Sequence, residues 1–285
     1  MMSHSTIQLA MGQMLVEGGK PEENLRRAES IVRQAAEKGA QIVVLPECLD
    51  LGWTHPSAKE LAEPIPGRYC DVLREAAVQA DIFIVAGLTE RFVHAGDDRV
   101  YNAAVLIGAN GRILLKHRKI NILDIAQDLY AIGDRLAVAE TPLGVIGLSI
   151  CADNFGDSLC LGHSLARMGS QILLSPSAWA VPADFDNAAT PYGGLWIEAY
   201  TTLAPLYGMP VVGVSNVGPI TGGPWRGRQC IGCSLAVDGT GHIVAQLPYG
   251  QTAEHLEIVS LDVTARRALG TDIAPTLRAK GYRGP

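Results

Sequence analysis

Apolar and polar positions alternate along the chain with two periods, which predict strands and helices in turn. Residues 7–11 form a short apolar run typical of a strand, and residues 21–39 then carry apolar side chains at helical spacing. A proline in the first turn and Gly39 at the end are the usual start and stop signals of a helix. Residues 41–45 are almost wholly apolar, which is typical of a strand buried on both faces.

The same alternation continues to residue 261 and favours an α/β fold with two halves whose sheets could face each other. Asn110-Gly111 and Asp238-Gly239 each stand between two strands and indicate β-hairpins. Pro205 falls inside the last helical pattern and is expected to kink that helix or end it early. The pattern predicts further helices over 68–80, 158–168 and 194–207, and strands over 82–86, 103–107, 112–116, 144–150, 171–175, 211–215, 231–237, 242–247 and 255–261.

The composition indicates one folded unit. Of the 285 residues, 48% are hydrophobic and 18% are charged, which supplies a large core and too little charge for disorder. No Ser/Gly/Pro linker occurs, so we expect a single domain over 1–285, with its core over about 5–262 and a basic tail over 263–285. The net charge of −6 argues against nucleic-acid and anionic membrane partners. Neither a membrane-spanning apolar run nor a secretory signal is found, so a cytoplasmic protein is expected.

The cysteines do not have the pattern of a disulfide framework. In a chain of this length they are expected to be reduced. Cys230 and Cys233 form a C-x-x-C, but no second ligand pair stands at a matching spacing, so neither a metal site nor a redox role is favoured there.

Three reactive side chains stand just after predicted strands, where ligands bind in open α/β folds. They are Glu47, Lys119 and Cys151. Taken singly, each has a structural explanation, as a helix cap, a solvated charge and a small buried apolar side chain. Together they form a catalytic set, with a carboxylate as general base, an ammonium that stabilises an oxyanion, and a thiol that carries an acyl group.

The segments around these residues resemble the three signatures of the nitrilase superfamily, the carbon–nitrogen hydrolases. The resemblance is carried by Leu45-Pro46-Glu47, by residues 111–119 (Gly-Arg-Ile-Leu-Leu-Lys-His-Arg-Lys) and by residues 147–153 (Gly-Leu-Ser-Ile-Cys-Ala-Asp). Similar segments also occur over 101–105, 169–179, 210–216 and 232–241, so the resemblance covers roughly residues 5–262 in one order.

The resemblance implies a four-layer α-β-β-α sandwich, the triad Glu47, Lys119 and Cys151, and neither a metal nor an organic cofactor. The thiol would attack a small linear amide or carbamoyl compound and expel ammonia or an amine, and water would then release the acid. The backbone N–H of Ala152 is expected to join Lys119 in holding the oxyanion, because it begins the turn at a helix N-terminus. Homo-oligomers are usual in the family, so a dimer or a larger assembly is expected.

The chain departs from the family pattern near the expected pocket. Many members carry a second Glu before a Pro-Gly-Asp, and an ungapped match places Ala126 there, with Gln127 or Asp128 as substitutes if the loop shifts. Asn121 stands in place of the usual residues after the Lys motif. Nitrile-hydrolysing members typically have Trp-Glu after the Cys, so Ala152-Asp153 argues against that branch.

These observations favour an amidase and keep two alternatives, a nitrile hydrolase and a catalytically weak binding or scaffold member. The lining of the pocket is also open. Trp179 could line the acyl pocket or pack in the core, and Asn216 could orient polar groups or serve as a turn residue. Tyr192, Trp196 and Trp225 lie in Gly-rich stretches that could form lids or subunit contacts.

Overall fold

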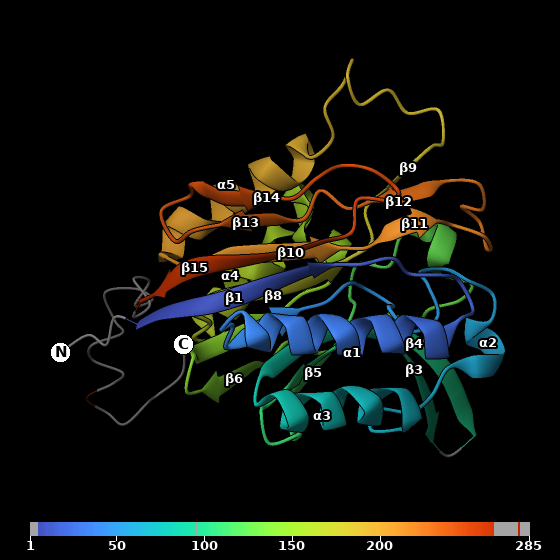
Figure 1. Cartoon of the computed structure of the whole chain (residues 1–285), viewed down its shortest axis with the longest axis horizontal. Helices are drawn as coiled ribbons and strands as arrows, with labels where there is room; N and C mark the ends of the chain where they lie inside the picture. The colour runs from blue at the N-terminus through green and yellow to red at the C-terminus, as the bar shows by residue number, and fades with distance from the viewer. Residues whose placement is uncertain (1–4, 95, 265–278, 280–285) are drawn as a thin grey trace.

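Two six-stranded sheets stand face to face in the computed structural model, which describes residues 5–94, 96–264 and 279 (Figure 1). The first sheet consists, in spatial order, of β15 (His255–Val263), β1 (Ser5–Gln13), β2 (Ile42–Val44), β3 (Phe83–His94), β4 (Asp97–Ile107) and β5 (Ile113–Arg118). The second consists of β14 (Ile243–Gln246), β13 (Leu235–Val237), β10 (Val211–Ser215), β8 (Ile172–Ser177), β7 (Gly144–Leu148) and β6 (Val138–Thr141). Both sheets are mixed, since β1, β2 and β3 run parallel, as do β7, β8 and β10, while the outer pairs are antiparallel.

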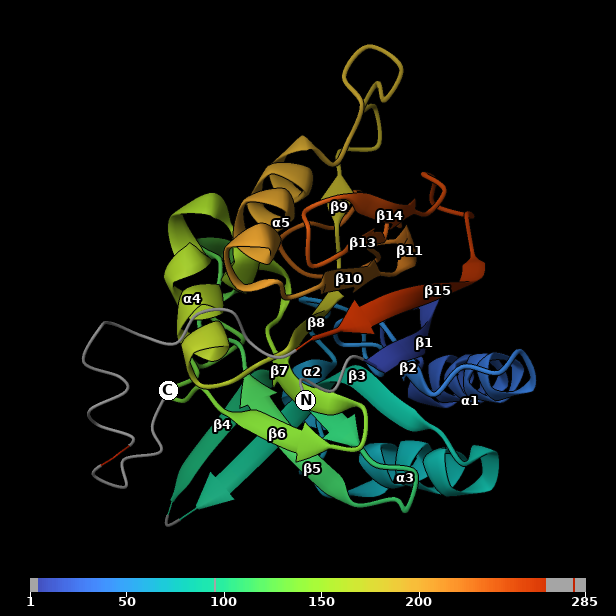
Figure 2. The ribbon, with the colours of Figure 1, turned by 90° about the vertical axis from the view of Figure 1, so that its left-hand side faces the viewer.

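Helices cover the outer faces of the two sheets, as Figure 2 shows. On the first sheet these are α1 (Pro21–Glu37) and α3 (Arg68–Ala80), with the short α2 (Ala58–Leu61) nearby; on the second they are α4 (Leu159–Arg167) and α5 (Gly194–Tyr207). A small third sheet joins β11 (Val217–Pro219), β12 (Gln229–Ile231) and β9 (Ala180–Val181). Three short 3-10 turns complete the fold, η1 (Asp124–Ala126), η2 (Cys151–Asn154) and η3 (Gly156–Ser158).

The strand alternation explains why four layers form. In β2, Ile42 and Val44 belong to the core between the sheets, whereas Val43 belongs to the core under α1 and α3. All three side chains are fully buried. A strand with side chains buried on both faces needs cover on both sides, and this confirms the interpretation of residues 41–45.

Most predicted elements are confirmed, and two details are corrected. The predicted strand over 231–237 is split between β12 and β13, because Gly232 and Cys233 both adopt left-handed backbone angles, with φ of 66° and 59°. The helix that contains Pro205 continues to Tyr207, so it does not end before the proline. The predicted basic tail lies almost wholly outside the described residues. Within those residues, no helix combines the length and the apolar content needed to cross a bilayer.

Candidate active site

The structure brings Glu47, Lys119 and Cys151 together, as the sequence predicts. The Lys119 ammonium donates a hydrogen bond of 2.6 Å to Glu47 Oε1, and both side chains are buried. Lys119 and Cys151 line one cavity, and the charges of Glu47 and Lys119 both act on the Cys151 thiol. The Asn102 amide donates a second 2.6 Å hydrogen bond to Glu47 Oε1, which holds the carboxylate in place. The Lys119 ammonium, the Glu47 carboxylate and the Cys151 thiol thus lie within one buried site.

The loop after β2 fixes Glu47 between the sheets. The Glu47 N–H donates to the carbonyl of Ser177 at the end of β8, at 3.2 Å, so this loop is tied to the second sheet. Gly87 of β3 lies against it, and a Cβ there would come within 2.5 Å of Glu47 Cα. Glycine is therefore required at that position for the backbones to approach.

A buried carboxylate anchors the far end of the same loop. Asp50 accepts hydrogen bonds from the N–H groups of Leu51 and Thr89 and from the Thr89 hydroxyl. Burial raises the pKa of Asp50 to about 6, although these hydrogen bonds partly oppose the shift. The Asp50 carboxylate thus clamps the Glu47 loop to β3 and carries a charge that burial disfavours.

This shift predicts a pH-dependent stability. Between about pH 4 and about pH 6 the unfolded chain has ionised Asp50, whereas the folded chain retains the proton, so this contribution to stability falls as pH rises. The difference in unfolding free energy between wild type and Asp50→Asn should fall by about 2 kcal/mol from about pH 4 to about pH 7. Denaturant titrations of both proteins measure it, and a difference that stays constant with pH would contradict the assignment.

The nucleophile turn after β7 has a strained backbone. Cys151 has a φ of 44°, in the left-handed region that non-glycine residues rarely adopt. The turn is held by its neighbours: the Cys151 N–H donates to Ser175 Oγ at 3.1 Å, and the Asn154 amide donates to the Cys151 carbonyl at 3.2 Å and to Ser175 Oγ at 2.9 Å. The sharp turn places the thiol at the cavity wall while the flanking backbone stays bonded.

Asp153 joins the strand end that carries Lys119 to the turn that carries Cys151. Its Oδ2 hydrogen-bonds to His117 Nε2 at 2.8 Å and accepts the N–H of Ile150 at 3.0 Å. Its Oδ1 accepts the N–H groups of Ile120 and Asn121, at 3.1 and 2.8 Å. Burial raises the pKa of Asp153, but the hydrogen bond and charge of His117 outweigh it, so the pKa lies below its usual value. Asp153 therefore remains an ionised crosslink between two strand ends.

Burial and the neighbouring Glu47 charge keep the Cys151 thiol protonated in the free protein. Burial and the Glu47 charge raise the pKa of Cys151 to about 12, while Lys119 and the N–H of Ala178 act in the opposite direction. Burial lowers the pKa of Lys119, but the charge of Glu47 and the hydrogen bond to it raise that pKa above its ordinary value. The site thus contains a neutral thiol beside a carboxylate that can remove its proton.

The cavity that Lys119 and Cys151 line has a volume of about 440 Å³ and is rich in aromatic rings. All four tryptophans of the chain line it, including Trp179, Trp196 and Trp225, whose positions the sequence analysis left open. Tyr192 and Phe185 also line it. They come from the segment between β9 and α5, which extends away from the sheets (Figure 1, Figure 2). The aromatic lining is assembled from segments far apart in sequence.

The structure corrects the prediction that Asp128 or Gln127 replaces the family's second Glu. Both side chains are exposed, and neither lines the cavity. Ala126 itself is buried in η1, in an apolar cluster that includes Cys48 and Tyr130. Gln127 and Asp128 point outward after η1. The buried apolar side chain of Ala126 therefore occupies the position expected for the family's second Glu.

Asn216 is also corrected as a pocket residue. It lies between β10 and β11, is buried, and is absent from the lining of the cavity that contains Lys119 and Cys151. Cys230 and Cys233 are buried free thiols. Among the described residues, no group of three or more His, Cys, Asp or Glu side chains has the arrangement to hold a metal. Asn216 and the C-x-x-C therefore belong to the support of the small third sheet.

Ala152 follows Cys151 in η2 and is fully buried, and its role as an oxyanion donor stays a prediction. Asn102, His117 and Asp153 had no predicted roles. His117 lies two residues before Lys119, so the two side chains point to the same face of the strand. This spacing was the sign in the sequence that His117 lies near the site.

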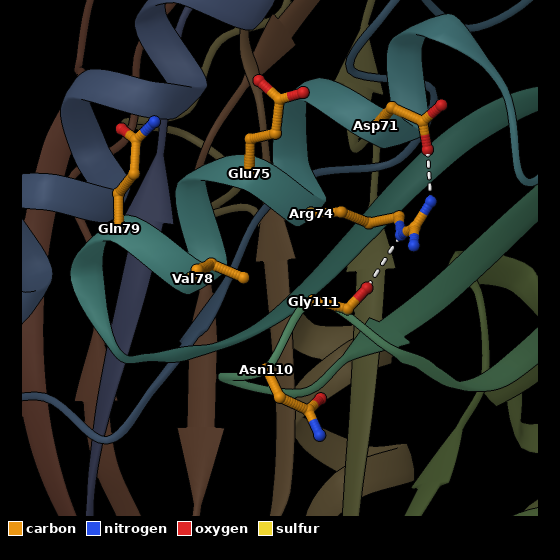
Figure 3. Close-up of a pocket in the computed structure, with 7 residues that line it drawn as sticks. All are labelled: Asp71, Arg74, Glu75, Val78, Gln79, Asn110 and Gly111. Carbon is orange, nitrogen blue, oxygen red and sulfur yellow. Dashed lines mark hydrogen bonds and ion pairs between the residues drawn. The ribbon is translucent and has the colours of Figure 1, made fainter.

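A second hollow, of about 510 Å³, lies between α3 and the hairpin turn at Asn110-Gly111 (Figure 3). The Arg74 guanidinium spans this hollow and donates hydrogen bonds of 2.6 Å to Asp71 Oδ1 and of 2.7 Å to the carbonyl of Gly111. Gly111 has a φ of 75°, and a Cβ there would lie 2.9 Å from Val78, which explains the glycine of the predicted hairpin. The hollow is an α3-to-hairpin contact whose arginine is already occupied.

Residues 8–269 match the Carbon-nitrogen hydrolase family. Omega-amidase NIT2 of Xenopus tropicalis is 34% identical over 182 residues, which are 60% of this chain and 63% of that relative, so the match spans less than two thirds of its length. A nitrilase of Pyrococcus abyssi is 28% identical over 263 residues, 90% of each chain. A carbon–nitrogen hydrolase crystal structure from Helicobacter pylori G27 has a TM-score of 0.78 at 20% identity, covering 97% of this chain and 93% of that one. This likeness confirms the α/β fold, with two mixed sheets flanked by helices, and the family match covers both sheets and the candidate site. The chain is a member of the carbon–nitrogen hydrolase family, the nitrilase superfamily.

Proposed function

We propose that the protein hydrolyses the C–N bond of a small linear amide or carbamoyl compound through a thioester on Cys151. The observation that carries this proposal is the buried arrangement of the triad: Lys119 and Cys151 line one cavity, Lys119 donates a hydrogen bond to Glu47, and the Glu47 charge acts on the Cys151 thiol. A nucleophile, its base and a fixed cation in one enclosed site are the parts that acyl transfer requires.

The neutral thiol determines how the reaction begins. Because the pKa of Cys151 is raised to about 12, Glu47 removes the thiol proton as sulfur attacks the substrate carbonyl. The carbonyl oxygen becomes an oxyanion, which Lys119 and the Ala152 N–H stabilise. When the C–N bond breaks, the protonated Glu47 gives its proton to the leaving nitrogen, and ammonia or an amine departs.

The same carboxylate serves the second half of the reaction. Glu47 takes a proton from water, whose oxygen attacks the thioester carbonyl, and the C–S bond then breaks. The proton returns from Glu47 to sulfur, so the acid leaves and the free thiol is restored. One carboxylate can serve both steps because Glu47 is ionised at the start and at the end of each: it passes the thiol proton to the leaving nitrogen in the first step and a proton of water to sulfur in the second.

Amides are expected to be turned over in preference to nitriles. Ammonia release from matched pairs with the same carbon skeleton, such as propionamide and propionitrile, measures the preference. We expect kcat/KM for the amide to exceed that for the nitrile by about a hundredfold or more. Differences of this size are common when a substrate lacks a polar group that the site binds. Turnover of the nitrile alone would replace this proposal by nitrile hydrolysis.

A binding or scaffold role makes the opposite prediction for the thiol. If Cys151 reacts with an acrylamide-type electrophile no faster than a free thiol, and Lys119→Ala leaves that rate unchanged, the enzymatic proposal fails. The expected homo-oligomer, a dimer or a larger assembly, and the expected cytoplasmic location both stay predictions. Light scattering of the full chain tests the assembly.

A further inference from the structure

The cavity next to the triad carries almost no charge. Among the described residues that line it, Lys119 has the only charged side chain, and its ammonium is already paired with Glu47 at 2.6 Å. Outside the triad, the polar side chains are limited to the Thr190 hydroxyl, the Tyr192 hydroxyl and the indole N–H groups. A negative charge on a bound substrate would find, among these lining residues, no cationic side chain other than the already paired Lys119 to replace its hydration.

The aromatic rings are packed against one another and present apolar surface. Trp179 and Trp196 stack with ring centroids 4.8 Å apart and an interplanar angle of 17°, and Phe155 lies 5.3 Å from Trp196. Trp53 and Trp225 form an edge-to-face pair at 4.9 Å. The rings are therefore fixed before a ligand binds, which lowers the cost of ordering them around an apolar group.

The polar edge of one of these rings is already satisfied. The Trp196 indole N–H donates to the Tyr192 hydroxyl at 3.0 Å, which also restrains the segment between β9 and α5. This hydrogen bond occupies the Trp196 N–H, one of the few polar groups in the cavity lining. The surface that remains for an acyl group consists mainly of ring carbon.

We propose that this cavity selects amides whose acyl group is neutral and apolar, aliphatic or aromatic, and rejects amides whose acyl group carries a carboxylate. The inference rests on the proposed function, because it places the acyl group beside the Cys151 thiol. Each methylene buried in such a cavity should raise kcat/KM by about fourfold. A carboxylate that loses its hydration without a partner should lower kcat/KM by about a hundredfold or more relative to a neutral group of the same size.

A kinetic series tests the selection. The substrates are propionamide, butyramide, hexanamide and 3-phenylpropionamide, with succinamate as the carboxylate-bearing counterpart. We expect kcat/KM to rise along the neutral series and to be at least about a hundredfold lower for succinamate than for a neutral amide of similar length. Preference for succinamate, for instance through the peptide N–H groups of the first turn of α5, would overturn the inference and leave the proposed hydrolysis standing.

Binding supplies a readout that needs no turnover. In a Cys151→Ala variant, titration with 3-phenylpropionamide should change the tryptophan fluorescence, because all four tryptophans line the cavity. Succinamate at the same concentration should produce no saturable change. If apolar amides bind but no amide is hydrolysed by wild type, the proposed function fails while the selection stands; if succinamate binds more tightly, the selection fails.

A matched pair of phenylalanine variants locates the selectivity. Phe155→Ala should lower kcat/KM for 3-phenylpropionamide by about tenfold or more but for propionamide by less than about threefold, because only the larger acyl group contacts that ring. Phe92→Ala is the control, since Phe92 packs on Arg118 and is not part of the cavity lining. Equal losses for both substrates in Phe155→Ala, or the same change in both variants, would contradict the role of Phe155.

Discussion

Replacing Cys151 with alanine is expected to lower kcat for amide hydrolysis by about 10⁴-fold or more while the protein stays folded. The thiol forms the bond to the acyl group, so no other side chain in the cavity can take over this step. The fold should tolerate the change because alanine retains the Cβ at the strained φ of 44° and the backbone contacts of the turn to Ser175 and Asn154. Rates of ammonia release and thermal unfolding curves measure both parts of the expectation.

Cys160→Ala is the matched control for this variant. Cys160 is an exposed free cysteine on α4, outside the cavity lining. Its removal should leave the rate at the wild-type value. Activity that survives in Cys151→Ala would require a different nucleophile and would end the proposed mechanism.

Lys119→Met is expected to damage both activity and stability. The substitution leaves the Glu47 carboxylate buried with only the Asn102 amide as partner, and removing one member of a buried ion pair costs about 3–5 kcal/mol. It also removes the proposed oxyanion donor, so kcat should fall by about 10²–10³-fold or more. Assays should be run under conditions where circular dichroism shows that the variant is folded.

Lys116→Met, three residues earlier and at the other side of β5, separates the two effects. Lys116 also pairs with a buried carboxylate, Glu90, but Arg118 keeps two hydrogen bonds to that group, of 2.7 and 2.9 Å. This control should therefore remain near wild type in rate and lose little stability. A folded Lys119→Met variant with wild-type kcat would contradict the role assigned to the ammonium.

The sequence predicts the triad because each member follows a recognisable strand. Leu45, Leu115 and Ile150 close or border apolar runs, and the carboxyl ends of strands collect ligands in α/β folds. Helix α3 was predicted with its observed bounds, because its apolar spacing is regular and a left-handed residue, Asp81, ends it. The local sequence pattern was therefore sufficient to predict features that depend on a single helix or strand.

The rest of the site depends on contacts that local pattern does not contain. The bond between His117 and Asp153 joins residues 36 apart, and the aromatic cavity collects rings from residue 53 to residue 225. Asp128 and Asn216 were candidates because of their chain positions, but the Asp128 side chain is exposed and Asn216 lies between β10 and β11, outside the cavity lining. Side-chain direction in a loop follows from tertiary packing, so sequence spacing alone could not supply it.

A covalent acyl group on Cys151 is the central prediction for this protein. Acid quenching of the full-length protein during turnover of 3-phenylpropionamide, followed by intact-mass and peptide analysis, measures it directly. We predict that the protein gains the mass of the 3-phenylpropionyl group less one hydrogen, that the adduct maps to Cys151, and that hydroxylamine removes it. Steady turnover with no adduct on Cys151, or with the adduct on another cysteine, would contradict the account.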